Sequence, residues 1–151
     1  MNEALEIRPG TKVLEVGAGS GYHAATLAEI VNGEGHVFAV EFLDRLVAVA
    51  RTNLERAGYT PRVTLVQGDG SLGYPDRAPY ERILVTAAAP RIPHPLLEQL
   101  TPGGIMVIPI GGKMFPQELV RVRKKDDHSL LRESLGGVAF VPLVGKYGFS
   151  D

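Results

Sequence analysis

Three glycines at alternate positions, Gly17, Gly19 and Gly21, follow a short apolar run and precede a helix-forming stretch. Glycines at this spacing let the backbone turn sharply and approach a ligand closely. Turns of this kind between a strand and a helix bind several classes of ligand, dinucleotides among them. The glycines therefore predict a ligand site, and the residues around them must indicate which ligand it holds.

The residues next to the loop favour a ligand with an amino group over a pyrophosphate. Glu15 precedes the first glycine by two positions, where its negative charge would oppose a phosphate and favour an ammonium group. The spacing G-x-G-x-G also departs from the dinucleotide pattern G-x-G-x-x-G. S-adenosylmethionine (SAM) carries an ammonium group, a ribose and an adenine but no phosphate, so we predict SAM as the cofactor. The predicted contacts from this loop are Glu15, Gly17, Ala18, Gly19 and Gly21.

Two further acidic positions fit other parts of the same ligand. Glu41, with Phe42 beside it, lies 20 residues after Gly21, where a carboxylate binds ribose hydroxyl groups. Any ribose would be bound in this way, so Glu41 does not distinguish SAM from a dinucleotide. Asp69 would accept a hydrogen bond from the adenine amino group, and Gly70 would let the ring approach the backbone.

Short apolar segments alternate with helical patterns in the first part of the chain. Strands are predicted at Lys12–Val16, His36–Val40, Arg62–Val66, Arg82–Thr86 and Ile105–Pro109. Helices are predicted at about Tyr22–Val31, Leu43–Ala57 and Pro93–Leu100. This alternation predicts an α/β fold, a doubly wound, mainly parallel Rossmann-like sheet of the SAM methyltransferase kind, with the first strand central. The glycine loop and the acidic residues would then meet at the carboxyl ends of neighbouring strands.

The pattern changes after Gly112. Glu118–Lys125 and Leu130–Pro142 are typical of two strands around a polar turn, and they predict an antiparallel C-terminal edge on the parallel sheet. The order of these two strands stays open. The basic run at Arg121–Lys125 alternates with valine, so we expect a solvated strand edge there rather than a nucleic-acid site.

Composition and charge limit the classes of function. The chain of 151 residues is 44% hydrophobic and 22% charged, which is typical of a single globular domain spanning residues 1–151. Its net charge of -1 gives no electrostatic reason to expect nucleic acid or an anionic membrane as a partner. It has no cysteine, no cluster of metal-ligating residues and no signal-peptide pattern, so we expect no metal and a cytoplasmic location.

Four segments closely resemble successive parts of the protein-L-isoaspartate O-methyltransferases, SAM-dependent enzymes that methylate isoaspartyl residues in damaged proteins. They read KVLEVGAGSGYHAATLAEIV, QGDGSLGYPDRAPYERILVTAAAP, LTPGGIMVIPIG and GGVAFVPLVGKYGF, and the resemblance runs from about Pro9 to Phe149. It implies that Glu41 binds the ribose and that Asp69 with Gly70 contacts the adenine.

The resemblance also implies a substrate. The partners would be isoaspartyl-containing proteins or peptides, bordered by the apolar segment Val138–Pro142. The substrate-side candidates are Ala88, Phe140, Val141 and Pro142. A carboxylate substrate is ionised near pH 7 and needs positioning more than a general base, so we name no catalytic residue.

One feature of the family is not found in this sequence. Members usually carry a longer segment ahead of the equivalent of Pro9, with a motif like T-I-S-x-P beside the SAM methyl group, and this sequence has eight residues there. We therefore expect a chain that binds the cofactor and methylates slowly, unless a partner chain or self-association covers the methyl side of the site.

Two other functions stay open on the residues alone. One is a SAM-binding protein or fragment without catalytic activity, and the other is a nucleotide-dependent oxidoreductase, which Glu15 and the glycine spacing disfavour. The loop Thr86–Pro90 lacks the Asn/Asp-Pro-Pro-aromatic arrangement of amino-group methyltransferases. Methylation of nucleic-acid bases is therefore disfavoured as well.

Overall fold

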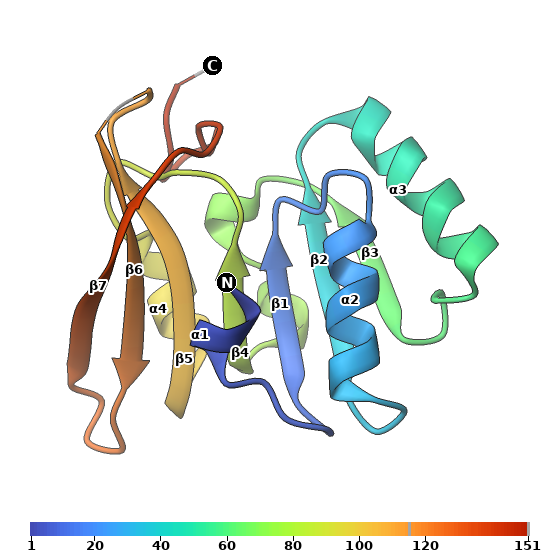
Figure 1. Ribbon diagram of the computed structural model, residues 1–151, viewed down its shortest axis with the longest axis horizontal. Coiled ribbons are helices and arrows are strands. Elements are labelled where there is room, and N and C mark those ends of the chain that lie inside the picture. Colours follow the sequence, from blue (N-terminus) through green and yellow to red (C-terminus); the bar gives the residue numbers. More distant parts are fainter. Residues whose placement is uncertain (115, 151) are drawn as a thin grey trace.

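Seven strands form one mixed sheet in the computed structural model, which describes residues 1–114 and 116–150 (Figure 1). The strand order is β3-β2-β1-β4-β5-β6-β7. The strands are β1 (Lys12–Val16), β2 (His36–Glu41), β3 (Val63–Gln67), β4 (Tyr80–Val85), β5 (Leu100–Gly111), β6 (Gln117–Lys124) and β7 (Leu130–Val138). The first five strands run parallel, while β6 and β7 are antiparallel to their neighbours. The predicted α/β fold with an antiparallel edge is confirmed.

Helices cover both faces of this sheet. In Figure 1, α1 (Asn2–Leu5), α2 (Tyr22–Val31) and α3 (Asp44–Ala57) lie in front of it, and α4 (His94–Gln99) lies behind. Two short 3₁₀ turns, Gly70–Leu72 and Pro75–Arg77, connect β3 to β4. Because β1 leads into α2 through the glycine loop, that loop stands at the carboxyl end of a central strand.

An apolar layer fills the space on each side of the sheet. Side chains alternate along a strand, so Val13 and Glu15 project toward the face that carries α2, and Leu14 and Val16 project toward the other. The layer under α2 contains Leu5, Val13, Leu27, Val37 and Leu54, and the opposite layer contains Leu14, Phe38, Tyr80, Leu96 and Met106. Glu15 therefore enters an apolar layer.

Most predicted boundaries agree with the structure to within two residues, and two differ by more. β5 begins at Leu100, directly after α4, instead of at Ile105, because Thr101–Gly104 already extends from the end of the helix. β7 ends at Val138 instead of Pro142. The chain leaves β6 there because the Gln117 side chain donates to the Phe140 oxygen and accepts from the Phe140 N–H. The residues that follow pair with Ala88.

The basic run on β6 makes contacts within the molecule. Arg121 donates to the Glu133 carboxylate at 2.7 Å, and Arg123 forms an ion pair with Glu6. Lys124 donates to the backbone oxygens of Leu97 and Leu100 at the end of α4. β6 lies between β5 and β7, so the prediction of a solvated strand edge is wrong for this run: these basic side chains are paired within the molecule. No helix among the described residues is both long and apolar enough to cross a membrane.

Candidate functional site

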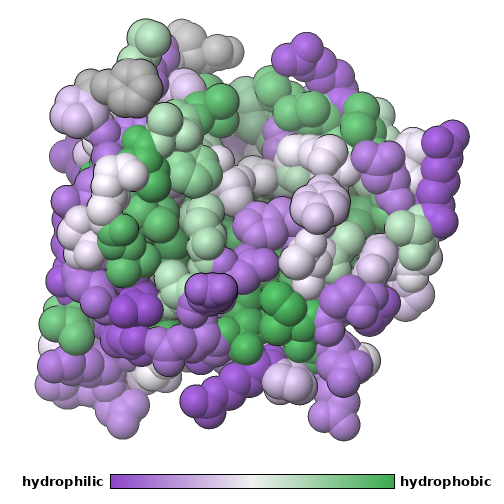
Figure 2. Space-filling model, viewed as in Figure 1, coloured by the Kyte–Doolittle hydropathy of each residue, from purple (hydrophilic) through white to green (hydrophobic). Residues whose placement is uncertain are grey.

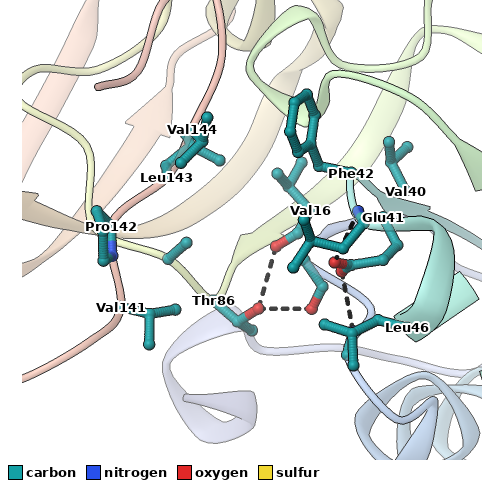
Figure 3. Close-up of a pocket in the computed structure, with 15 residues that line it drawn as sticks. Val16, Val40, Glu41, Phe42, Leu46, Thr86, Val141, Pro142, Leu143 and Val144 are labelled. Carbon is teal, nitrogen blue, oxygen red and sulfur yellow. Dashed lines mark hydrogen bonds between the residues drawn. The ribbon is translucent and has the colours of Figure 1, made fainter. Parts of the chain in front are cut away.

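A cavity of about 290 Å³ lies at the carboxyl ends of β1, β2 and β4 (Figure 3). Its walls come from the glycine loop, the start of α3, the turns after β3 and β4, and the C-terminal segment. Figure 2 shows apolar surface along the upper part of the molecule, where these strands end. Phe42, Leu43 and Val141 belong to the exposed apolar residues of the wall segments. Its position matches the rule that ligands of open parallel sheets bind at the carboxyl ends of the strands.

Gly17 fixes the floor of the cavity. Its φ angle of 95° is in the left-handed region, and an ideal Cβ would lie 2.6 Å from Thr86 Oγ1. The Thr86 hydroxyl donates to the Gly17 oxygen at 2.7 Å, and the Gly17 N–H donates to the Val40 oxygen at 2.9 Å. The loop is thus fastened to the ends of two neighbouring strands, and only glycine fits at this position.

Glu41 supplies the carboxylate of the cavity wall. It is 7% exposed, and its Oε2 accepts a hydrogen bond from the Gly19 N–H at 3.1 Å. Its Oε1 accepts a longer bond from the Leu43 N–H at 3.4 Å. Each carboxylate oxygen can accept two hydrogen bonds, so Glu41 retains capacity for ligand hydroxyl groups. Phe42 lies beside it in the wall, as Figure 3 shows.

Glu15 lies outside the cavity wall, in the apolar layer behind the glycine loop. It is fully buried, and within the described residues neither carboxylate oxygen has a hydrogen-bond partner. Burial, together with the nearby charge of Glu41, raises the pKa of Glu15 to about 8. Because strand side chains alternate, β1 turns Glu15 away from the cavity while Val16 lines it. Glu15 therefore does not line the cavity, and its role toward the amino acid end of a bound ligand stays a prediction.

The Asp69 carboxylate accepts hydrogen bonds from other residues of the chain. Its Oδ1 accepts from the N–H and the hydroxyl of Ser71 at 2.9 and 2.6 Å, and its Oδ2 accepts from the Lys146 N–H at 2.8 Å. Asp69 thereby begins the first 3₁₀ turn and holds the C-terminal segment. Gly70 lines the cavity, whereas Asp69 does not.

The other named loop residues, Ala18 and Gly21, also lie outside the wall. Gly21 has a φ angle of 87°, and an ideal Cβ there would lie 3.2 Å from Leu54 Cγ and 3.3 Å from the Ala50 oxygen. The backbone of Gly21 therefore packs closely against α3. Its requirement for glycine comes from helix packing rather than from the cavity.

The four substrate-side candidates divide into two pairs. Val141 and Pro142 line the cavity, whereas Ala88 and Phe140 do not. The Ala88 N–H donates to the Val141 oxygen, and the Leu143 N–H donates to the Ala88 oxygen, both at 2.8 Å. Ala88 therefore positions this wall without facing the cavity.

Several wall residues have no counterpart among the sequence candidates. They are Val16, Val40, Leu43, Leu46, Thr86, Ala87, Leu143 and Val144. Most of them end or directly follow a predicted strand, and this position is the one feature that could have indicated them. Their apolar side chains do not indicate a ligand. Among the described residues, no three or more His, Cys, Asp or Glu side chains gather as a metal site.

Comparisons with known proteins find one family over nearly the whole chain. The family model described as Protein-L-isoaspartate(D-aspartate) O-methyltransferase (PCMT) matches residues 1–148. A protein-L-isoaspartate O-methyltransferase from Methanopyrus kandleri is 55% identical over 151 residues, covering 100% of this chain and 66% of that relative. The chain thus spans slightly less than two thirds of that relative's length.

Two solved structures resemble the fold. A protein-L-isoaspartate O-methyltransferase superimposes with a TM-score of 0.85 at 32% identity, covering 97% of this chain and 46% of its own. A Plasmodium falciparum protein solved with S-adenosyl-L-homocysteine superimposes with a TM-score of 0.79 at 24% identity. That match covers 91% of this chain and 67% of the other, and it supports the fold alone.

Proposed function

Because the chain belongs to the protein-L-isoaspartate(D-aspartate) O-methyltransferase family, we propose that it is a SAM-dependent methyltransferase of protein repair. Its substrate would be the carboxylate of L-isoaspartyl or D-aspartyl residues in damaged proteins and peptides. The observation that carries the proposal is the cavity at the carboxyl ends of β1, β2 and β4, with the Glu41 carboxylate in an otherwise mainly apolar wall.

The residues present fit the cofactor. Glu41 would accept hydrogen bonds from the ribose hydroxyl groups, and Gly17 and Gly19 would allow a close approach of the backbone. Gly70 would lie beside the adenine. Its backbone packs closely against Val16, because an ideal Cβ on Gly70 would lie 2.4 Å from Val16 Cγ1. Phe42 would add apolar contact at the rim.

Glu15 would attract the ammonium group of SAM electrostatically, without direct contact. Its buried carboxyl has no hydrogen-bond partner among the described residues, so an ammonium group bound nearby would favour the ionised form. The electrostatic attraction is strong in such an apolar layer because water does not screen it. Glu15 would thus support the amino acid end of SAM from behind the glycine loop.

When bound, SAM would supply a methyl group on a positively charged sulfur, and a substrate carboxylate oxygen would bond to the methyl carbon while its bond to sulfur breaks. The reference pKa of a carboxyl group is about 4, so the substrate is a nucleophile near pH 7 without a general base. The chain's residues therefore have to orient the carboxylate and exclude water. Orientation of this kind is worth roughly 7–11 kcal/mol of the barrier. Val141, Pro142 and Leu143 would form the water-excluding wall.

Calorimetric titration with S-adenosylhomocysteine, joined to a methyl-transfer assay, tests the proposal. The assay compares an isoaspartyl peptide with the same peptide carrying ordinary aspartate. We expect the chain to bind S-adenosylhomocysteine and to methylate the isoaspartyl peptide but not the aspartyl peptide. Binding without methylation would identify a SAM-binding protein without catalytic activity, and tighter binding of NADH than of S-adenosylhomocysteine would identify a nucleotide-dependent protein of another class.

A further inference from the structure

The C-terminal segment Leu143–Phe149 is attached to the turn after β3 by side chains of that turn. Asp69 Oδ2 accepts from the Lys146 N–H at 2.8 Å, and Ser71 Oγ accepts from the Tyr147 N–H at 3.0 Å. The Ser71 hydroxyl donates in turn to Asp69 Oδ1. We call Asp69, Ser71 and these two N–H groups the latch.

The latch is tightly packed. Ser71 is fully buried, and an ideal Cβ on Gly145 would lie 2.0 Å from Asp69 Oδ1 and 2.7 Å from Ser71 Oγ. The backbone of the C-terminal segment therefore rests directly on the two side chains. Hydrogen bonds from backbone N–H groups to a carboxylate are stronger than those between neutral groups. The contact spans 76 residues of sequence and is independent of the β-sheet ladder.

The latch joins two walls of the cavity. Gly70, between Asp69 and Ser71, lines one side, and Leu143 and Val144, just before the latched residues, line another. At its other end this second wall is held by Ala88 through the Val141 oxygen and the Leu143 N–H. The wall is thus fixed at both ends, once by backbone pairing and once by the latch.

We propose that Asp69 and Ser71 are positioning residues that hold the wall Val141–Val144 at the cofactor cavity. The proposal rests on the proposed function, which makes this wall the border between cofactor and peptide. Neither side chain lines the cavity, so both would act on the cofactor only through the wall that they hold.

Ser71→Ala tests the latch without removing a direct ligand contact, because Ser71 does not line the cavity. We expect the amides of Lys146 and Tyr147 to exchange hydrogen about tenfold faster, and the affinity for S-adenosylhomocysteine to fall about tenfold. Asp69→Asn should act in the same direction and at least as strongly. Lys146→Ala is the matched control: the latch uses only the backbone N–H of Lys146, so both quantities should stay within about twofold of the parent.

Parent-like exchange at both amides in Ser71→Ala would overturn the latch. Faster exchange with unchanged affinity for S-adenosylhomocysteine would overturn its positioning role. If the parent itself binds no S-adenosylhomocysteine, the proposed function fails separately, and the amides of Ala88 and Leu143 decide the inference. Their exchange should accelerate in Ser71→Ala because they hold the same wall, and unchanged exchange there would contradict the proposal.

Discussion

Glu41 accepts a hydrogen bond from the backbone N–H of Gly19, which is 22 positions away in sequence, with 3.1 Å between Oε2 and the nitrogen. The bond connects the end of β2 to the loop after β1. The same carboxylate lines the cavity, so it braces the loop and is available to a ligand at once. Loop geometry and ligand binding are therefore coupled through one side chain.

Replacing Glu41 tests this coupling. Glu41→Ala is expected to weaken binding of S-adenosylhomocysteine by roughly 1.5–3 kcal/mol, the range for hydrogen bonds to a charged group, as measured by calorimetry. Glu41→Gln keeps one acceptor oxygen and should lose less. An alanine variant that binds as tightly as the parent would show that Glu41 does not hold the ribose.

The two glycines of the loop should differ in their tolerance of a side chain. Gly17→Ala is expected to cost roughly 2–5 kcal/mol of unfolding free energy, from left-handed strain and from the contact with Thr86. Gly19→Ala shares the strain, but an ideal Cβ there meets nothing within 4 Å, so it should cost only roughly 1–2 kcal/mol. Urea denaturation measures both. Equal losses would argue against the close contact, and Gly17→Ala combined with Thr86→Ala should recover part of the larger loss.

The sequence predicted the strands, the helices and the antiparallel edge because their patterns are local. Alternation and turn residues within ten or so positions identify each element, and short connections then order the parallel strands. β1 and α2 were predicted with the bounds that the structure has. The glycine loop and Glu41 could be located in the same way, since the loop directly follows β1 and Glu41 ends β2.

Asp69 and Glu15 show where such reasoning stops. The partner of Asp69 is the N–H of Lys146, which is 77 residues away and follows a segment with no regular pattern. For Glu15, the sequence shows a carboxylate at the end of a strand but leaves open which face of the sheet it joins. The structure places Glu15 on the same face as Val13, in the apolar layer under α2.

Glu15 should make the stability of the protein depend on pH. Its pKa is about 8 in the folded protein and 4.5 as a free side chain, so the folded state holds a proton that the unfolded chain releases. This contribution to stability is fully present below the unfolded pKa and is lost as pH rises through the folded pKa. Glu15→Gln, which carries no charge, should gain on the order of a few kcal/mol relative to the parent near pH 8.

Urea denaturation of both proteins between about pH 5 and pH 8 measures the difference. The parent should lose stability relative to Glu15→Gln as pH rises, and the two should converge at the acid end. Glu41→Gln removes the neighbouring charge and should lower the pH at which the loss of stability ends, because that charge helps to raise the Glu15 pKa in the folded protein. A constant difference across the range would show that Glu15 does not titrate in this window.

Val141 offers the sharpest test of the substrate side, because it is 70% exposed and lines the cavity. A charge at this position would act on a carboxylate substrate before the methyl group is transferred. Val141→Asp should raise the KM for an isoaspartyl peptide several-fold, and Val141→Lys should leave it unchanged or lower it. Added salt should reduce the difference between the two variants, since screening weakens exposed charges. Affinity for S-adenosylhomocysteine, measured in the same proteins, separates this effect from a change in the cofactor cavity, which Val141 also lines. If aspartate and lysine raise KM equally, the effect is one of shape, and Val141 does not face the substrate carboxylate.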